Sequence, residues 1–270
     1  MEAGRVGCQE ARPVESKVVA ARPVRHLPCG LCLGYSSSRL WSAHLSIANV
    51  RRATGSGLDA CHAAAYRAAM TAAIDFYFDF SSPYSYIANA WIGPLAARHG
   101  RDVRRHAILL GATFQAAELK PPVAYPLKRE YSLRDFERSA RFEGLTLALP
   151  AVFPIPTQNA ARVFWWLKET RGEETAAAWA KAGMAALFSD GAALHEPAAL
   201  KALATQHGLD GEAAESAWND TTWKARLKRA NDEAIAAGVF GAPFFVIDGE
   251  PFWGNDRKPQ VERWLSQGPF

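Results

Sequence analysis

One run of residues sets the architecture of this chain: Ile74-Asp75-Phe76-Tyr77-Phe78-Asp79-Phe80-Ser81-Ser82-Pro83-Tyr84-Ser85-Tyr86. Its first half is apolar and rich in aromatic side chains, which favours a buried strand. Ser82 and Pro83 then start a helix, because a serine oxygen caps free backbone N–H groups and proline suits the first turn. We expect this helix from about Tyr84 to His99, with Gly100 ending it. The run therefore predicts a strand, a sharp hydroxyl-bearing turn and a helix.

The turn itself is a candidate functional site. It holds the Ser82 hydroxyl where the strand ends and the partial positive charge of the helix begins. A thiolate or another anion would be stabilised at such a position. The simpler interpretation, in which Ser82 is an N-cap and nothing more, stays open on this segment alone. Ser81 is a competing hydroxyl.

A second informative run lies far downstream: Gly238-Val239-Phe240-Gly241-Ala242-Pro243-Phe244-Phe245-Val246-Ile247-Asp248-Gly249-Glu250-Pro251-Phe252-Trp253-Gly254-Asn255-Asp256-Arg257. It predicts a loop, a strand, a two-residue Asp-Gly turn, a second strand, and a glycine loop that leads into a short C-terminal helix. Between Ala242 and Pro243 we expect a cis peptide bond, because only X–Pro bonds reach the cis form at low cost.

The order of the predicted elements indicates an α/β fold. A strand, a helix and a second strand at 103–109 come first, a long helical region follows, and a hairpin with a closing helix ends the chain. This is the order of a thioredoxin-like fold with a large all-helical domain inserted between its two halves. We therefore assign residues 70–110 and 238–270 to the thioredoxin-like domain and residues 111–237 to the inserted domain.

The insertion has the sequence pattern of helices. The segment 127–142 is amphipathic, and the segment 175–188 is rich in alanine, the residue with the highest helix propensity. Further helices are predicted at 159–170, 197–207 and 211–237. If these helices pack over the Ser82 end of the sheet, they form the walls of a substrate cleft.

The first 69 residues differ from the rest, and we expect a poorly ordered extension. All four cysteines lie here, and Cys29 and Cys32 have the spacing of a redox pair. No convincing strand precedes that pair and no periodic helix follows it, so we interpret it as incidental. A transit peptide is another interpretation, and three glutamates among the first 15 residues weigh against it. Because Met70 runs directly into the first strand, we favour it as the natural start, with residues 1–69 not native.

The formal net charge of +4 is concentrated in that N-terminal segment. Residues 1–69 carry nine basic and four acidic residues, a net +5, so the remainder is close to neutral at −1. A near-neutral globular part does not indicate nucleic-acid binding. No uncharged apolar run reaches the roughly 18 residues that span a bilayer, so we expect no membrane segment. The seven histidines show no metal-ligand spacing, and we expect no metal.

Together the two runs resemble the 2-hydroxychromene-2-carboxylate isomerase family, which is related to kappa-class glutathione transferase. The strand that ends in Ser-Pro, the Gly-Ala-Pro-Phe-Phe-Val strand and the Phe-Trp-Gly-Asn-Asp-Arg loop carry the resemblance, which covers about residues 71–265. It implies a glutathione-dependent enzyme whose serine replaces the first cysteine of thioredoxin-like disulfide oxidoreductases.

The resemblance implies a role for each motif. Ser82 would be catalytic, its hydroxyl pointing at the glutathione sulfur and, with the helix N-terminus, lowering the pKa of the thiol. Ala242, just before Pro243, would exchange backbone hydrogen bonds with the glutathione cysteine, as an added strand does at a sheet edge. The γ-glutamyl end would be held by Trp253, Gly254, Asn255 and Asp256.

The reaction that the resemblance implies is a cis–trans isomerisation in the degradation of aromatic compounds. The glutathione thiolate would add reversibly to a conjugated, ring-opened substrate. The expected partners are glutathione and a small aromatic-derived carboxylate. A cysteine-free core and the use of reduced glutathione fit the cytoplasm, and a homodimer is expected.

The chain departs from the family's pattern where a positive group should hold the substrate carboxylate. The family's lysine falls near Thr113, and its Asn-Arg pair falls within Pro121-Pro122-Val123. The candidate substrate-binding residues are therefore Thr113, Lys128 and Phe153.

Two alternatives stay open beside the isomerase. A kappa-like glutathione transferase or peroxidase would share every cofactor residue. A non-catalytic thioredoxin-like binding module is disfavoured by the intact loop at 253–256. We expect His106 to be a core or rim residue, and Trp165, Trp166 and Trp179 to belong to the helical core rather than to a cofactor site.

Overall fold

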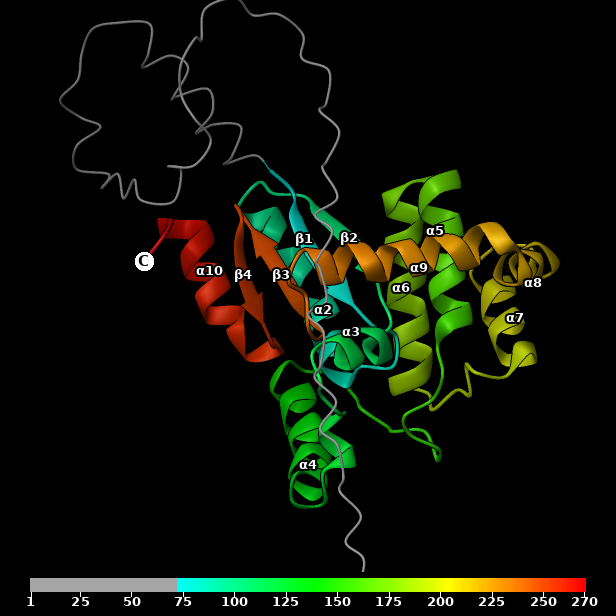
Figure 1. Cartoon of the computed structure of the whole chain (residues 1–270), viewed down its shortest axis with the longest axis horizontal. Coiled ribbons are helices and arrows are strands. Elements are labelled where there is room, and N and C mark those ends of the chain that lie inside the picture. Colours follow the sequence, from blue (N-terminus) through cyan, green and yellow to red (C-terminus); the bar gives the residue numbers. More distant parts are fainter. Residues whose placement is uncertain (1–71) are drawn as a thin grey trace, which may run out of the picture. The chain divides into compact units, whose positions relative to one another are not determined.

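The computed structural model describes residues 72–270, so the expectations for residues 1–69, including the Cys29 and Cys32 pair, lie outside the described residues. Within the described part the protein has an α/β fold, with one mixed four-stranded sheet and helices packed around it (Figure 1). The thioredoxin-like fold with a helical insertion, which the sequence predicts, is confirmed. No helix of residues 72–270 is long and apolar enough to cross a membrane.

The sheet has the strand order β2-β1-β3-β4. β1 (Ile74–Phe78) pairs in parallel with β2 (Val103–Ala107) and antiparallel with β3 (Phe244–Ile247). β4 (Glu250–Trp253) returns antiparallel to β3 through the predicted Asp-Gly turn. Both turn residues have positive φ, 57° at Asp248 and 89° at Gly249, as a two-residue hairpin of this kind requires.

Buried and half-buried side chains alternate along β1, and this alternation shows which face of the sheet packs in the main core. Ile74, Phe76 and Phe78 are fully buried, whereas Asp75 and Tyr77 are half-buried on the opposite face. The buried face packs in one hydrophobic cluster with α2 (Pro83–Arg98), the helix that the sequence predicts within one residue at each end.

The helices of the insertion differ from the prediction at one place. Residues 211–237 form two helices rather than one, because Asp220 ends the first helix and its carboxyl group accepts a hydrogen bond from the N–H of Thr222 at 2.6 Å. The elements between β2 and β3 are α3 (Leu110–Ala116), η2 (Pro122–Ala124), α4 (Pro126–Phe142), α5 (Gln158–Arg171), α6 (Glu173–Phe188), α7 (Pro197–Gln206), α8 (Gly211–Asn219) and α9 (Thr221–Ala236). After β4 follow η3 (Asn255–Arg257) and α10 (Lys258–Gln267).

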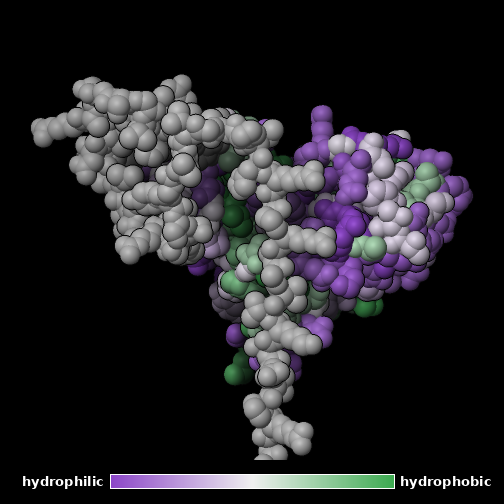
Figure 2. Space-filling view, turned by 45° about the horizontal axis from the view of Figure 1, so that its top comes forward, coloured by the Kyte–Doolittle hydropathy of each residue, from purple (hydrophilic) through white to green (hydrophobic). Residues whose placement is uncertain are grey.

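The inserted helices divide into two groups (Figure 1). Helices α5 to α9 gather in a lobe on the β2 side of the sheet, whose surface is mainly hydrophilic in the view of Figure 2. Helix α4 lies apart from that lobe, whereas α3 lies at the end of the sheet where β1 turns into α2 and contacts α9 of the lobe. The expectation that inserted helices form walls of a cleft at the Ser82 end holds for α3, η2, α4 and the segment before α5, which line the cavity there. The α5 to α9 lobe packs mainly against β2 and α2.

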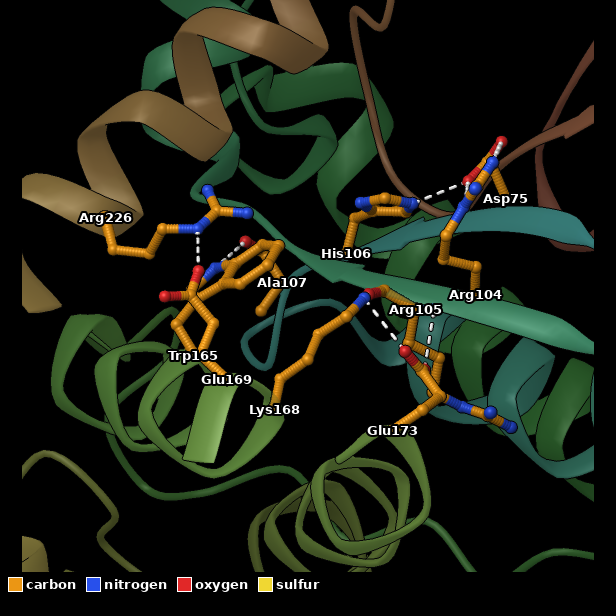
Figure 3. Close-up of polar contacts among 10 residues, drawn as sticks. All are labelled: Asp75, Arg104, Arg105, His106, Ala107, Trp165, Lys168, Glu169, Glu173 and Arg226. Carbon is orange, nitrogen blue, oxygen red and sulfur yellow. Dashed lines mark hydrogen bonds and ion pairs between the residues drawn. The ribbon is translucent and has the colours of Figure 1, made fainter. Parts of the chain in front are cut away.

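Side chains of α5 and α6 bind the backbone of β2 directly (Figure 3). The indole Nε1 of Trp165 donates to the carbonyl oxygen of Ala107 at 2.9 Å, and the Arg105 N–H donates to Glu173 Oε1 at 2.8 Å. Lys168 donates to the Arg105 carbonyl oxygen and forms an ion pair with Glu173. Trp165 is thus a core residue, as predicted, and it also joins the lobe to the sheet.

Candidate active site

Ser82 lies where β1 turns into α2. It is the N-cap of α2, and its Oγ accepts a hydrogen bond from the N–H of Ser85 at 3.1 Å. Only 4% of its surface is exposed. The predicted cap is confirmed, and the hydroxyl lies at the positive end of a helix of 16 residues, where negative charge is favoured.

The carboxyl group of Asp79 organises this turn. Its Oδ1 accepts hydrogen bonds from the N–H and the hydroxyl of Ser81, at 2.7 and 2.9 Å, and from Thr157 Oγ1 at 3.0 Å. Its Oδ2 accepts one from the N–H of Leu110 at 2.6 Å. One side chain therefore joins the end of β1 to the starts of α3 and α5. The competing hydroxyl of Ser81 is engaged by Asp79.

The turn before β3 also lies beside Ser82, although it comes from the C-terminal part of the chain. The Ala242–Pro243 peptide bond is cis, as predicted, and Ser82 Oγ donates to the Ala242 carbonyl oxygen at 3.3 Å. A second cis bond, Phe153–Pro154, was not predicted from the sequence.

The loop that follows β4 is fixed against both α2 and the proline turn. The indole Nε1 of Trp91 in α2 donates to Asn255 Oδ1 at 2.8 Å, and the Gly254 N–H donates to the Pro243 carbonyl oxygen at 3.0 Å. Asn255 therefore uses its side-chain oxygen to hold the loop in place. This anchoring role was not foreseen for a residue expected to bind the cofactor.

The same loop presents polar groups on its outer side. The φ of Gly254 is +110°, a backbone conformation that strains any residue with a Cβ, so glycine is favoured there. The Asp256 side chain is 72% exposed and pairs with the Arg257 guanidinium at 3.1 Å. Half of the Trp253 surface is exposed as well.

These elements surround a cavity of about 1090 Å³. Ligand pockets typically measure about 300–1,000 Å³, so this cavity has room for more than one small molecule. It brings together eight of the predicted site residues: Ser82, Phe153, Ala242, Pro243, Trp253, Gly254, Asn255 and Asp256.

Two predicted substrate-binding residues do not line the cavity. Thr113 is fully buried inside α3, where its Oγ1 donates to the Leu110 carbonyl oxygen at 3.2 Å. Lys128 lies on the exposed face of α4 with its Nζ 5.0 Å from the centre of the Tyr125 ring. The structure therefore does not bring these two predicted residues into the cavity beside Ser82.

A second part of the cavity lining, which we call the apolar half, comes mainly from α3, η2, α4 and the loop before α5. Tyr84 and Phe136 pack edge to face with ring centres 4.8 Å apart, and Phe136 meets Phe153 in the same way at 6.3 Å. Further apolar side chains on this wall are Leu109, Leu110, Phe114, Leu119, Val123 and Ile155.

A tyrosine and an aspartate meet on this wall. The Tyr84 hydroxyl donates to Asp135 Oδ2 at 2.5 Å, and Asp135 forms an ion pair with Arg138. Burial, followed by the hydrogen bond to Asp135, raises the pKa of Tyr84 well above its usual range, so the hydroxyl keeps its proton.

Sequence reasoning missed Asp79, Tyr84 and Asp135 as site residues. Asp79 carried a signal, because an acidic residue between buried aromatic residues needs hydrogen-bond partners. Tyr84 directly follows the Ser-Pro turn and could have been found from the same run. Asp135 gave no signal, since it is one of many charged residues on an amphipathic helix.

Comparison with known proteins agrees with this geometry. Residues 73–266 match the profile of the DSBA-like thioredoxin domain, and this is the class that the fold and the serine turn define. A 2-hydroxychromene-2-carboxylate isomerase of Sphingobium xenophagum is 31% identical over 198 residues, which cover 73% of this chain and 99% of that protein. The chain therefore belongs to the 2-hydroxychromene-2-carboxylate isomerase family.

Two further comparisons bear on this assignment: one with a solved structure of the same family and one with a kappa-class glutathione transferase. A solved 2-hydroxychromene-2-carboxylate isomerase structure superposes with a TM-score of 0.65 at 29% identity, covering 72% of this chain and 94% of that one. A kappa-class glutathione S-transferase of Caenorhabditis elegans is more distant, at 26% identity over 214 residues that cover 73% of this chain and 92% of the relative.

Proposed function

We propose that the protein is a glutathione-dependent isomerase that interconverts the cis and trans forms of a small, aromatic-derived, conjugated compound. The observation that carries the proposal is the Ser82 hydroxyl, held at the α2 N-terminus and facing the Ala242 carbonyl in a cavity with two unlike halves. One half is the polar loop after β4, and the other is the apolar wall.

The residues around Ser82 suit the parts of glutathione. The main chain of Ala242 lines the cavity before the cis proline, and it would pair with the peptide portion of the cofactor. The exposed carboxyl group of Asp256 suits an α-ammonium group, and the Arg257 guanidinium suits a carboxylate. The thiol would then lie beside Ser82.

When bound, glutathione would supply a thiolate for reversible addition to a conjugated double bond, and the carbon–carbon bond would be single, and free to rotate, until elimination restored the double bond. The protein's part is to stabilise that thiolate. The Ser82 hydroxyl has one proton, which is directed to the Ala242 carbonyl oxygen at 3.3 Å. Hydroxyl-to-oxygen hydrogen bonds usually measure about 2.5–3.0 Å, so this bond is weak and the proton can turn to a sulfur anion.

The test has a binding part and a turnover part. Calorimetry should detect binding of glutathione and of S-methylglutathione, which keeps the peptide contacts and cannot form a thiolate. A cis-configured conjugated carbonyl compound should be converted to its trans form with glutathione and not with S-methylglutathione. If neither heat nor a thermal shift accompanies millimolar glutathione, the proposal is wrong.

A kappa-like glutathione transferase is the second candidate, favoured by the kappa-class relative. The two functions differ in the fate of the cofactor. An isomerase returns glutathione unchanged, whereas a transferase releases a product that contains the glutathione sulfur. Mass spectrometry of the completed reaction distinguishes them. Binding of glutathione without any turnover would instead indicate a non-catalytic module.

A further inference from the structure

The charges around the cavity bear on the kind of substrate that it accepts. Among the described residues that line the cavity, the acidic ones are Asp79, Asp135 and Asp256, and the basic one is Arg257. Arg257 belongs to the β4 loop, where it pairs with Asp256 at 3.1 Å. It therefore lies in the half of the cavity that we assign to the cofactor.

Three basic side chains near the apolar half have partners within the protein, and three others in this region, Lys120, Lys128 and Arg134, do not line the cavity. Arg138 forms its ion pair with Asp135, and Lys258 pairs with Glu143 at 2.6 Å. Arg129 donates to the Val123 carbonyl oxygen at 3.4 Å. None of these three cations lines the cavity.

The apolar half instead suits a neutral ring system. Tyr84, Phe136 and Phe153 contact one another edge to face and form an aromatic border of the cavity. An aromatic ring of a bound ligand would gain apolar contacts with several of these side chains. The polar groups beside this border include the Tyr84 hydroxyl, which keeps its proton, and the Asp135 carboxyl group. Other polar side chains on the same wall are uncharged: Gln115, Tyr131, Ser139 and Gln158. A substrate carboxylate placed here would face Asp135 and lose water without gaining a cation.

Building on the proposed function, we propose that the substrate of this site is an uncharged, aromatic conjugated carbonyl compound rather than a carboxylate. The inference concerns the class of ligand and rests on the apolar wall and the placement of the charges. The acid and the methyl ester of one carbon skeleton differ mainly in that charge, so they are the matched probes.

Binding is measured first. The saturated pair 4-phenyl-2-oxobutanoate and its methyl ester cannot accept a thiolate at a double bond, so calorimetry reports affinity alone. We expect the ester to bind at least about tenfold more tightly than the acid, with S-methylglutathione present or absent. Turnover of the corresponding cis unsaturated pair with glutathione should favour the ester by a similar factor.

A charge-introducing variant tests the cause. Gln115 lies on α3, is exposed, and lines the cavity, so Gln115→Arg should narrow or reverse the preference and bring the acid into the site. Gln206→Arg adds the same charge at the exposed end of α7, outside the cavity, and should leave the ratio unchanged.

The outcomes separate this inference from the proposed function. Tighter binding of the acid than of the ester, or no binding of either, would overturn the inference even if glutathione binds. A missing glutathione signal would reject the proposed function, while the ratio of ester to acid affinity, measured without cofactor, would still decide the ligand class.

Discussion

The hydroxyl of Ser82 donates to the main-chain oxygen of Ala242 at 3.3 Å, although 160 positions of sequence separate the two residues. Ser82 caps the helix that follows the first strand of the fold, and Ala242 precedes the third strand. Their contact joins the two halves of the thioredoxin-like domain at the point where the site is formed, and it is long enough to be exchanged for a contact with a ligand.

Ser82→Ala should raise the pKa of bound glutathione and slow turnover at neutral pH. A hydrogen bond to a charged group is worth about 1.5–3 kcal/mol, so a rate loss of roughly 10- to 100-fold is expected. Binding should weaken less, because Ala242 and the β4 loop contact the peptide portion. The thiolate absorbance of the complex, followed against pH, gives the pKa directly.

Ser81→Ala is the matched control for that variant, since the Ser81 hydroxyl donates to Asp79. It should cost much less activity than Ser82→Ala. Recovery of the Ser82→Ala rate at alkaline pH supports thiolate stabilisation. Equal, mild losses at the two serines would count against it.

Asp79→Ala should destabilise the fold and weaken ligand binding together. The substitution removes the acceptor of four hydrogen bonds at the junction of β1, α3 and α5. Each buried donor left unpaired costs about 1–3 kcal/mol, so we expect a loss of at least about 2 kcal/mol in the free energy of unfolding. Urea denaturation measures it, and Thr157→Val, which removes one of the four bonds, should cost less.

Trp91→Phe should weaken glutathione binding, although we assign Trp91 no direct contact with the cofactor. It removes the donor that holds Asn255 Oδ1 at 2.8 Å and so loosens the β4 loop. A hydrogen bond contributes about 1 kcal/mol, which corresponds to a several-fold rise in the dissociation constant. Trp264→Phe removes an indole that donates to Asp248 away from that loop, and it should leave the affinity unchanged.

Stability should fall on acidification because of a cluster on β1 and β2 (Figure 3). Burial lowers the pKa of His106 below 6.5, helped by the nearby charges of Lys168 and Arg104 and opposed by the hydrogen bond to Asp75. The unfolded chain then binds the proton more readily, so this stability is present above pH 6.5 and is lost as the pH falls below it.

Asp75 adds a second step at lower pH. Burial alone would raise its pKa, but the hydrogen bonds and charges of His106 and Arg104 outweigh burial and lower the pKa from 3.8 to about 2. The stability that the lowered pKa of Asp75 contributes is lost as the pH falls from 3.8 to about 2. Urea denaturation at several pH values should show a smaller change between pH 7 and 5 for His106→Gln than for the unaltered protein. His207→Gln, at the exposed end of α7, should keep the full change.

Substitution of both Cys29 and Cys32 by serine should leave glutathione binding and turnover unchanged. The prediction follows from the sequence around the pair, whose pattern predicts neither the strand nor the helix of a redox motif. Calorimetry and the isomerisation assay measure it, and a loss of activity would assign the pair a function.

Local patterns were enough to place the elements that hold the site. Ser82 and Pro83 start α2 as predicted, and Asp248-Gly249 makes the hairpin, because caps and turns depend on adjacent residues. Thr113 was misplaced because sequence does not show which side of a short helix faces inward. Asp135 was missed because its partner Tyr84 lies 51 positions earlier, and pairings over that separation leave no local pattern.

The bonds from Trp165, Lys168 and Glu173 to the β2 backbone have a consequence beyond the joining of two domains. β2 and β4 are the outer strands of the sheet, and an outer strand with free N–H and carbonyl groups is a template for another chain. Side chains occupy such groups on β2, while Pro251, which has no N–H to donate, stands in β4. Each outer strand thus resists intermolecular pairing by its own means, and loss of the α5 contacts would expose the protein to aggregation through β2.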